Sequence, residues 1–209
     1  MHNRVKIINT LIEKYNYKTY LEIGIRHKET FNAIKLPEES KECIDPNYDN
    51  VTYKLTSDEA FKSISTTKKW DIVFIDGLHE AGQAFREVEN SLKHLNENGT
   101  IICHDMLPPE GKFNLSLSRY GNGWEAYARL KMTNKNLQMY VVNTDCGCAV
   151  IRKGKQQLYV DDNFNHDFSK YNGKEIIGNK FEIDYKQKRK QWMDTKSMDE
   201  FIKFIKNEK

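Results

Sequence analysis

No run of apolar residues in the 209-residue sequence approaches the ~20 needed to cross a bilayer, so the sequence predicts no membrane span. The N-terminal stretch, MHNRVKIINTLIEKY, is amphipathic and lacks the apolar core and cleavage site of a signal peptide. Only four cysteines occur, and Cys146-Gly147-Cys148 has no second Cys or His pair nearby. The sequence is therefore only weak evidence for a zinc site. We therefore expect free thiols and a cytoplasmic protein.

An excess of charge of one sign is also absent. The 33 basic and 30 acidic side chains are mixed along most of the chain and leave a net charge of +3. The one basic cluster, 186–190 (KQKRK), is typical of a solvated helix face. The sequence therefore predicts no nucleic-acid partner.

The glycine fingerprint of dinucleotide-binding proteins is missing as well. Gly24 follows a predicted strand, but the next four residues, IRHK, contain no second glycine. A nicotinamide cofactor is accordingly disfavoured.

The chain nevertheless has enough apolar and aromatic residues to form a core. Hydrophobic residues make up 38% of it, with 11 Tyr, 10 Phe and 3 Trp, which excludes a disordered protein. Its length fits one domain with elaborations. We expect an N-terminal helix over 1–18, a core over 19–153 and a C-terminal extension over 154–209.

Within the core, apolar runs that are typical of buried strands alternate with stretches of helical periodicity. The predicted strands are 19–25, 42–45, 51–55, 70–76 and 100–105; the predicted helices are 29–34, 58–65 with Ser57 as its cap, and 81–95, closed by Asn98-Gly99. This alternation predicts a parallel sheet with helices on both faces. A loop over 106–122, a helix over 124–131, paired strands over 137–143 and 148–152, and a last helix capped by Ser197 and Glu200 should follow.

Ligands of such sheets bind beyond the carboxyl ends of the strands. Glu22 and Gly24 stand at the end of the first predicted strand, and Asp45 ends the second. A glycine there permits close approach of a ligand, and a carboxylate at the second strand can accept hydrogen bonds from both ribose hydroxyls of a nucleoside. The alternatives are a tight turn at Gly24 and an Asx turn begun by Asp45.

The strongest strand is followed by Asp76-Gly77-Leu78-His79, and its expected neighbour ends in His104-Asp105. Two carboxylates and two imidazoles at adjacent strand ends are typical of an acid–base site. Alternatively, His79 caps the next helix and His104 is a hydrogen-bonded core residue.

At this point the motifs carry a resemblance. The stretch WDIVFIDGLHEAGQAFREVENSLKHLNENGTIICHD resembles a family of class I S-adenosylmethionine-dependent methyltransferases with Asp-Gly-x-His and His-Asp motifs. LEIGI resembles the first motif of that family, and ECIDPN resembles its ribose-binding motif. Later stretches, GNGWEAYARL, VVNTDCGCAV and FEIDYKQKRKQW, resemble members associated with glycan and secondary-metabolite modification. Arg26 in place of the second glycine of the first motif is a departure, and so is Gly99-Thr100 in place of Gly-Gly.

The resemblance implies a Rossmann-like fold with a mainly parallel, seven-stranded sheet and helices on both faces. It also implies transfer of a methyl group from S-adenosylmethionine to a hydroxyl of a sugar, a glycan or a small metabolite. The expected cofactor-binding residues are Glu22, Gly24, Asp45, Ser57, Asp58 and Asp76, and the expected catalytic residues are Asp76, His79, His104 and Asp105.

Two mechanisms for deprotonating the acceptor remain open. In one, Asp76, His104 and Asp105 bind magnesium or manganese. In the other, His79 or His104 is a base without a metal ion, oriented by Asp105. We expect Tyr120 and Trp124 to stack on the acceptor, with packing of Trp124 against its own helix as the alternative.

Two further functions stay open on the sequence. One is N-methylation of an amino sugar, which would differ only in the acceptor pocket. The other is an inactive S-adenosylmethionine-binding partner domain of a glycosyltransferase. The sequence leaves open whether the chain forms a homo-oligomer or is fused to a glycosyltransferase.

Overall fold

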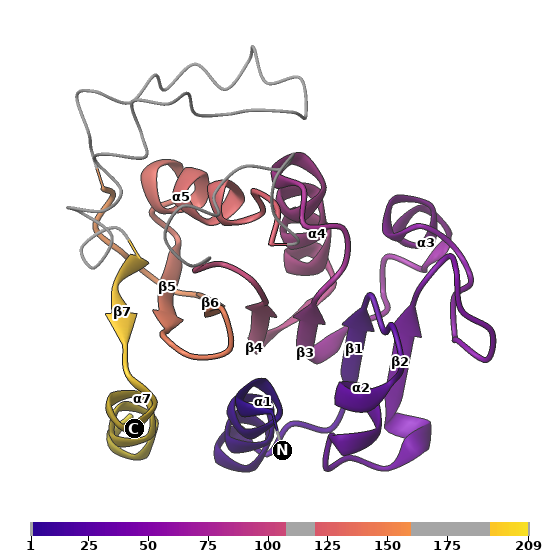
Figure 1. The fold of residues 1–209 in the computed structure, drawn as a ribbon, viewed down its shortest axis with the longest axis horizontal. Coiled ribbons are helices and arrows are strands. Elements are labelled where there is room, and N and C mark those ends of the chain that lie inside the picture. Colours follow the sequence, from indigo (N-terminus) through magenta and orange to yellow (C-terminus); the bar gives the residue numbers. More distant parts are fainter. Residues whose placement is uncertain (1, 108–119, 160–192, 209) are drawn as a thin grey trace.

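The computed structural model describes residues 2–107, 120–159 and 193–208 (Figure 1). Strands and helices alternate through the first half, as predicted. The helices are α1 (Asn3–Tyr15), α2 (Glu29–Ala33), α3 (Ser57–Ser63), α4 (Ala81–Lys93), α5 (Trp124–Thr133) and α7 (Met198–Asn207), with a 3-10 turn over Glu38–Ser40. The strands are β1 (Tyr20–Ile23), β2 (Lys41–Ile44), β3 (Trp70–Ile75), β4 (Leu95–Cys103), β5 (Leu137–Val142), β6 (Cys148–Lys153) and β7 (Thr195–Lys196).

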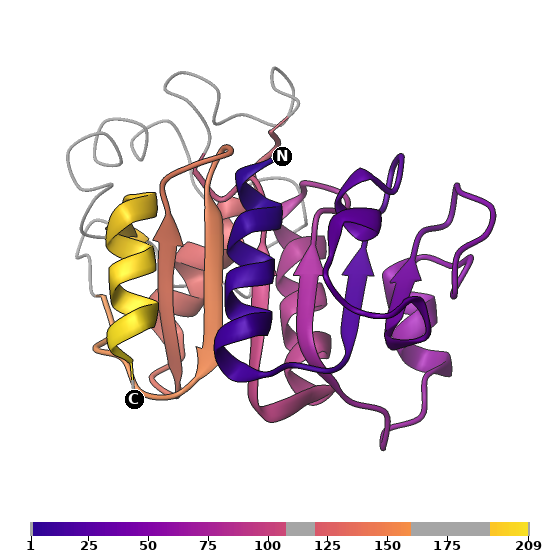
Figure 2. The same ribbon diagram turned by 90° about the horizontal axis from the view of Figure 1, so that it is seen from below.

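These strands form a seven-stranded sheet in the order β2-β1-β3-β4-β6-β5-β7. The pairs β1–β2, β1–β3, β3–β4 and β5–β7 are parallel, whereas β6 runs antiparallel to both β4 and β5. Helices α3, α4 and α5 cover one face, and α1, α2 and α7 cover the other (Figures 1 and 2). The predicted Rossmann-like fold is confirmed. None of the helices in these ranges is long and apolar enough to cross a membrane.

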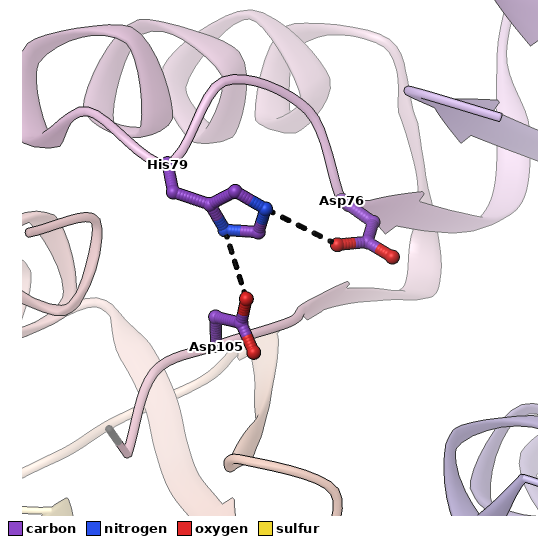
Figure 3. A group of neighbouring side chains, drawn as sticks. All are labelled: Asp76, His79 and Asp105. Atoms are coloured by element: carbon purple, nitrogen blue, oxygen red, sulfur yellow. Dashed lines mark ion pairs between the residues drawn. The ribbon is translucent and has the colours of Figure 1, made fainter. Parts of the chain in front are cut away.

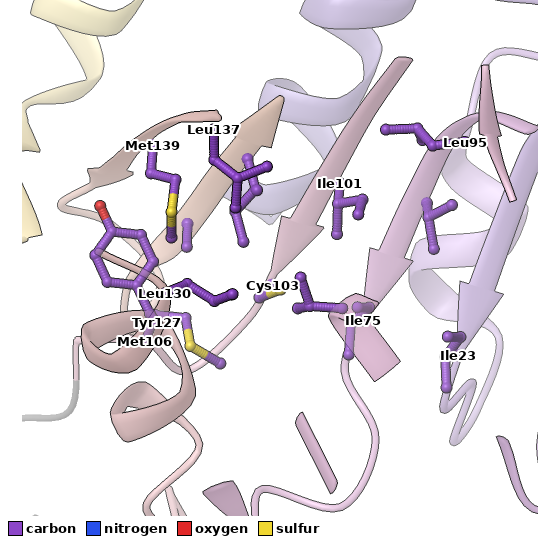
Figure 4. Close-up of a cluster of buried hydrophobic side chains, with 14 of the residues drawn as sticks. Ile23, Ile75, Leu95, Ile101, Cys103, Met106, Tyr127, Leu130, Leu137 and Met139 are labelled. Carbon is purple, nitrogen blue, oxygen red and sulfur yellow. The ribbon is translucent and has the colours of Figure 1, made fainter. Parts of the chain in front are cut away.

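Burial on both faces explains the continuous apolar run of β3. Ile72 and Phe74 belong to the cluster under α1 and α7, while Val73 and Ile75 belong to the cluster under α4 and α5, part of which is shown in Figure 4. All four side chains are almost fully buried. A strand between two helical layers needs apolar residues at successive positions rather than at alternate ones.

The predicted third strand, 51–55, is wrong. Only Tyr53 pairs with the sheet, through an isolated bridge to Ile44 beside β2. The backbone N–H of Cys43 donates to the side-chain oxygen of Thr52 and not to a backbone carbonyl of this segment, so the strand pairing does not continue. The seventh strand is instead β7, at the opposite edge, which the sequence did not indicate.

Two predicted helix ends also need correction. The N-cap of α3 is Thr56, which forms a capping box with Glu59, and Ser57 is the first helical residue. Helix α4 ends at Lys93 and is not closed by Asn98-Gly99, because both residues lie within β4. The capping box of Ser197 and Glu200 at α7 is confirmed.

Several predictions fall outside the described residues. These are most of the loop 106–122, the basic cluster 186–190 and the greater part of the C-terminal extension 154–209.

We predict that Gly99→Ala destabilises the fold. A Cβ at position 99 would lie 2.6 Å from Cγ of Leu95 and 2.8 Å from the carbonyl oxygen of Asp71, and backbone cannot easily yield. Overpacking of this kind costs about 1–3 kcal/mol of unfolding free energy. Chemical denaturation should show the loss, whereas Asn98→Ala at the exposed neighbouring position should leave the midpoint unchanged. Equal midpoints for both variants would contradict the prediction.

Candidate active site

A cavity of about 960 Å³ opens at the carboxyl ends of the parallel strands. The strand-end residues that the sequence singled out line it: Glu22, Gly24, Asp45, Asp76, His104 and Asp105. Ser57, His79 and Tyr120 line it as well. The fold therefore brings together residues that are up to 98 positions apart in the sequence.

Gly24 occupies the turn after β1, with a φ of 81°. A Cβ there would lie 2.4 Å from the carbonyl oxygen of Asp76, which is shorter than any tolerated contact. Only glycine therefore allows the turn after β1 to approach the end of β3 so closely.

Asp45 lies at the end of β2 and holds the neighbouring backbone. Its Oδ1 accepts a hydrogen bond from N–H of Asn47 at 2.9 Å, so the Asx turn exists. Its Oδ2 accepts one from N–H of Ile25 at 3.1 Å. Each carboxylate oxygen can accept a second bond, so Asp45 can stabilise this turn and still bind a ligand in the cavity.

Glu22 is buried, and its Oε2 accepts a hydrogen bond from the hydroxyl of Tyr20 at 2.5 Å. Burial raises the pKa of Glu22 to about 8 against the opposing effect of the Tyr20 hydrogen bond. Glu22 is accordingly protonated in the folded protein at neutral pH.

Asp76, His79 and Asp105 face one another across the ends of β3 and β4 (Figure 3). Nδ1 of His79 lies 3.2 Å from Oδ2 of Asp105, and Nε2 lies 3.7 Å from Oδ1 of Asp76. One ligand atom from each residue falls within 4.8 Å of the others, which suits a single metal ion. Oδ1 of Asp105 is buried, accepts no hydrogen bond and lies 3.3 Å from Nδ1 of His104, while the backbone of Asp105 has a φ of 58°.

His104 is held from both sides. Its Nδ1 lies 3.0 Å from Oδ1 of Asp76, and its Nε2 lies 3.6 Å from Oδ1 of Asp145 and 3.1 Å from Nη1 of Arg4. Burial lowers the pKa of His104, but the hydrogen bonds to Asp145 and Asp76 and the charges of Asp76 and Asp105 outweigh burial and raise it to about 10. A raised pKa favours the protonated imidazole at neutral pH, which speaks against His104 as the base or as a metal ligand.

Two residues at this end of the cavity were not predicted. Arg4 reaches in from α1, and its Nη1 lies 3.2 Å from Oδ2 of Asp145 in the β5–β6 turn. The hydrogen bond from His104 and the charge of Arg4 lower the pKa of Asp145 to about 2 against burial. The sequence carries no periodicity that would separate Arg4 from the other polar residues of its helix.

Trp124 and Asp58 are not where the sequence predicted them. The Trp124 side chain is only 2% exposed and packs in the core beneath α5, so the packing alternative holds and stacking on an acceptor does not. Asp58 pairs with Arg86 on the outer side of α3 and does not line the cavity. Of the predicted acceptor residues, Tyr120 alone lines it.

Residues 21–106, which include β1 to β4 and the whole Asp76–His79–Asp105 group, match a protein family described as a methyltransferase domain. None of the curated proteins compared matches the chain significantly.

Solved structures with the same fold include O-methyltransferases. A candidate caffeoyl-CoA O-methyltransferase from Staphylococcus aureus aligns with a TM-score of 0.54 at 19% identity, over 74% of this chain and 84% of that one. An O-methyltransferase from Bacillus cereus, solved in complex with S-adenosylhomocysteine, gives 0.52 at 14% identity over 72% and 80%. TomG from Streptomyces achromogenes, an O-methyltransferase solved with S-adenosylmethionine, gives 0.54 at 11% identity over 73% and 80%.

The raised pKa of Glu22 predicts a pH-dependent stability. The folded protein keeps the carboxyl protonated up to about pH 8, whereas the unfolded chain ionises it near its ordinary value of 4.5. Its contribution to stability is therefore fully present below pH 4.5 and is lost as pH rises toward 8.

Glu22→Gln cannot ionise and so does not lose stability in this way. The free energy of unfolding of the variant should therefore rise relative to that of the wild type by up to ~1.4 kcal/mol per pH unit across that window. Thermal unfolding of the ligand-free proteins from pH 5 to pH 8 measures it. The exposed Glu13→Gln is the matched control and should follow the wild type. A constant difference between Glu22→Gln and the wild type across the window would refute the assignment.

Proposed function

We propose that this protein transfers a methyl group from S-adenosylmethionine to a hydroxyl group of a small acceptor molecule, because residues 21–106 match a family described as a methyltransferase domain. The observation that carries the proposal is the convergence of three features in one cavity. These are the close turn at Gly24, the carboxylate of Asp45 and the Asp76–His79–Asp105 group. The O-methyltransferases that share the fold support the choice of oxygen as the acceptor atom.

The cofactor would lie across the ends of β1 and β2. Asp45 would accept hydrogen bonds from the ribose hydroxyls, and the turn at Gly24 would let the methionine portion approach the backbone. Glu22 and Ser57 line the same side of the cavity, whereas Asp58, with its ion pair to Arg86, has no part in this proposal.

Asp76, His79 and Asp105 would hold a divalent cation, with His79 in place of His104. The fit rests on their common reach and on the chemistry of the set, which offers two carboxylates and one imidazole. A bound cation of this kind would lower the pKa of an acceptor hydroxyl. The single nitrogen among oxygen ligands suits manganese at least as well as magnesium.

A second mechanism needs no metal ion, and the short contact between His79 and Asp105 favours it. Asp105 would accept a hydrogen bond from Nδ1–H of His79 and so leave Nε2 unprotonated, free to remove the hydroxyl proton of the acceptor. In both mechanisms His104 would hold Asp76 in place through its Nδ1–H rather than exchange protons.

The acceptor would enter beside Tyr120. The burial of Trp124 removes the aromatic platform that favoured a sugar, so we propose a small hydroxylated molecule and keep a sugar or glycan as members of that class. Methylation of amines and not of hydroxyl groups would indicate the N-methyltransferase alternative, and binding of the cofactor without methylation of any acceptor would indicate an inactive domain. The group formed by Asp76, His79 and Asp105 speaks against an inactive domain.

We predict that S-adenosylhomocysteine binds the wild-type protein and that Asp45→Ala weakens its binding about a hundredfold or more. The variant loses two hydrogen bonds to a charged group, each worth ~1.5–3 kcal/mol. Titration calorimetry measures the affinities, and circular dichroism confirms that the variant is folded. Unchanged affinity in Asp45→Ala, or binding of NADH instead, would overturn the cofactor assignment.

Metal dependence separates the two mechanisms. We expect exhaustive EDTA treatment to abolish methylation of a hydroxylated acceptor panel, followed by mass spectrometry, and manganese or magnesium to restore it. Full activity after chelation would leave His79 as the base. In both cases Asp105→Asn should lower kcat at least a hundredfold without unfolding the protein, because its carboxylate faces the group rather than the apolar core. Exclusive methylation of amines would refute the oxygen acceptor.

A further inference from the structure

The turn that carries His79 joins the end of β3 to the start of α4, and residues 76–80 in it form neither helix nor strand. The N-cap of α4 is Glu80, whose side chain makes no capping hydrogen bond, so His79 is not the N-cap of this helix. The first residue of α4, Ala81, is fully buried. Its N–H therefore needs an acceptor from elsewhere in the chain.

Asn122 supplies this acceptor. Its Oδ1 accepts a hydrogen bond from N–H of Ala81 at 2.9 Å, across 41 positions of the sequence. Its Nδ2 donates to Oε1 of Glu125 at 3.2 Å, and both Asn122 and Glu125 are buried. Because a carboxylate can only accept, Glu125 fixes the orientation of the amide and keeps its oxygen directed at α4.

The backbone beside Asn122 holds the main chain of His79. The carbonyl oxygen of His79 accepts hydrogen bonds from N–H of Asn122 at 2.9 Å and from N–H of Gly123 at 3.1 Å. Gly121 has a φ of 59°, and a Cβ there would lie 1.9 Å from the same carbonyl oxygen, so only glycine fits. Residues 121–123 therefore pack directly against the backbone of His79.

The position of this backbone decides whether the imidazole reaches its partners. Nδ1 lies 3.2 Å from Oδ2 of Asp105, and Nε2 lies 3.7 Å from Oδ1 of Asp76. The side chain of His79 is 27% exposed, so packing in the core does not hold it. A shift of about 1 Å would break the contact with Asp105, and a displacement of that size lowers the rate of an enzyme about a hundredfold.

We propose that Asn122 is a positioning residue of the methyltransferase site and that it places His79 opposite Asp105. The inference rests on the proposed function, in which His79 is either a metal ligand or the base. Asn122 is not among the residues that line the cavity, so it acts through His79 and not on the substrate. The proposal also gives a role to the stretch GNGWEAYARL, of which the proposed function uses only the preceding Tyr120.

Asn122→Ala tests the proposal with three measurements. Calorimetry should show an unchanged affinity for S-adenosylhomocysteine, because Asn122 is remote from the turn at Gly24 and from Asp45. For an acceptor that the wild type methylates, kcat should fall about tenfold to a hundredfold, as is typical when a residue that orients a ligand or a base is removed.

The third measurement needs neither activity nor a metal ion. Long-range ¹H–¹⁵N spectra of the ligand-free protein at pH 8 report which ring nitrogen of His79 carries the proton, and His79→Gln assigns the signals. In the wild type Nδ1 should be protonated, because it donates to Asp105. In Asn122→Ala the signals of both ring nitrogens should shift, because the bond that selects this tautomer is lost.

Asn9→Ala is the matched control. Asn9 is likewise a buried asparagine that holds backbone groups: its Nδ2 donates to the carbonyl of Ala33 at 3.0 Å, and its Oδ1 accepts from N–H of Lys35 at 2.9 Å. We expect Asn9→Ala to lower the denaturation midpoint as Asn122→Ala does, but to keep the wild-type kcat and the wild-type signals of His79. The comparison separates a loss of stability from a loss of positioning.

Should Asn122→Ala not fold, Asn122→Asp combined with Glu125→Gln decides the question. This double variant exchanges the amide and the carboxylate, so the total charge, the acceptor for Ala81 and the hydrogen bond between positions 122 and 125 are all kept. It should retain the wild-type kcat and ring signals, whereas Asn122→Asp alone places two carboxylates together and should lose both.

A folded Asn122→Ala protein that keeps the wild-type kcat or the wild-type ring signals overturns the inference. An equal loss of kcat in Asn9→Ala, or a folded double variant that behaves like Asn122→Asp alone, overturns it as well. A wild type that does not bind S-adenosylhomocysteine refutes the proposed function itself, while the ring signals still decide whether Asn122 positions His79.

Discussion

The in-register ends of β1, β3 and β4 determine where the polar groups of the cavity lie. Ile23 pairs with Ile75, and Ile75 pairs with Cys103, so the three strands stop at the same level. The residues that follow, Gly24, Asp76 and His104, are then neighbours by construction. The side chains of β3 alternate between two apolar clusters, so a slip by one residue would exchange them between the clusters and disturb the packing of both.

Charge compensation decides which of these polar groups can react. Three carboxylates, those of Asp76, Asp105 and Asp145, surround His104, and within the described ranges Arg4 is the second cation beside them. Asp145 is fully engaged with His104 and Arg4, which explains its low pKa and its separation from the chemistry. Burial raises the pKa of Asp105 even though His104 and His79 oppose this, so Asp105 is the carboxylate whose charge is least well compensated.

The sequence was sufficient for the fold and for most of the cavity because both follow from local patterns. Buried strands are continuous apolar runs, and each run is followed by the polar residues that face the ligand. The failures have physical causes that no local pattern reveals. The side chain of Thr52 accepts a backbone hydrogen bond from Cys43 that strand pairing would otherwise have used. Trp124 is buried in a cluster whose other members come from segments distant in the sequence. Arg4 and Glu87 lie on helices. The sequence alone does not distinguish a polar helical residue that faces the cavity from one that faces solvent, because the packing of the helix decides this.

The two ends of the cavity handle buried charge in opposite ways. At the α4 end a single buried carboxylate, Glu87, accepts hydrogen bonds from two neutral donors, Oγ of Ser57 and Nε2 of Gln83. At the β4 end three carboxylates face two cations, which leaves one negative charge uncompensated. Removing a proton from an acceptor hydroxyl would add another negative charge there, at high cost in a partly buried site. A cation held by Asp76, His79 and Asp105, or a proton taken up by His79, compensates that charge, so the electrostatics of this end make His79 and Asp105 central to either mechanism.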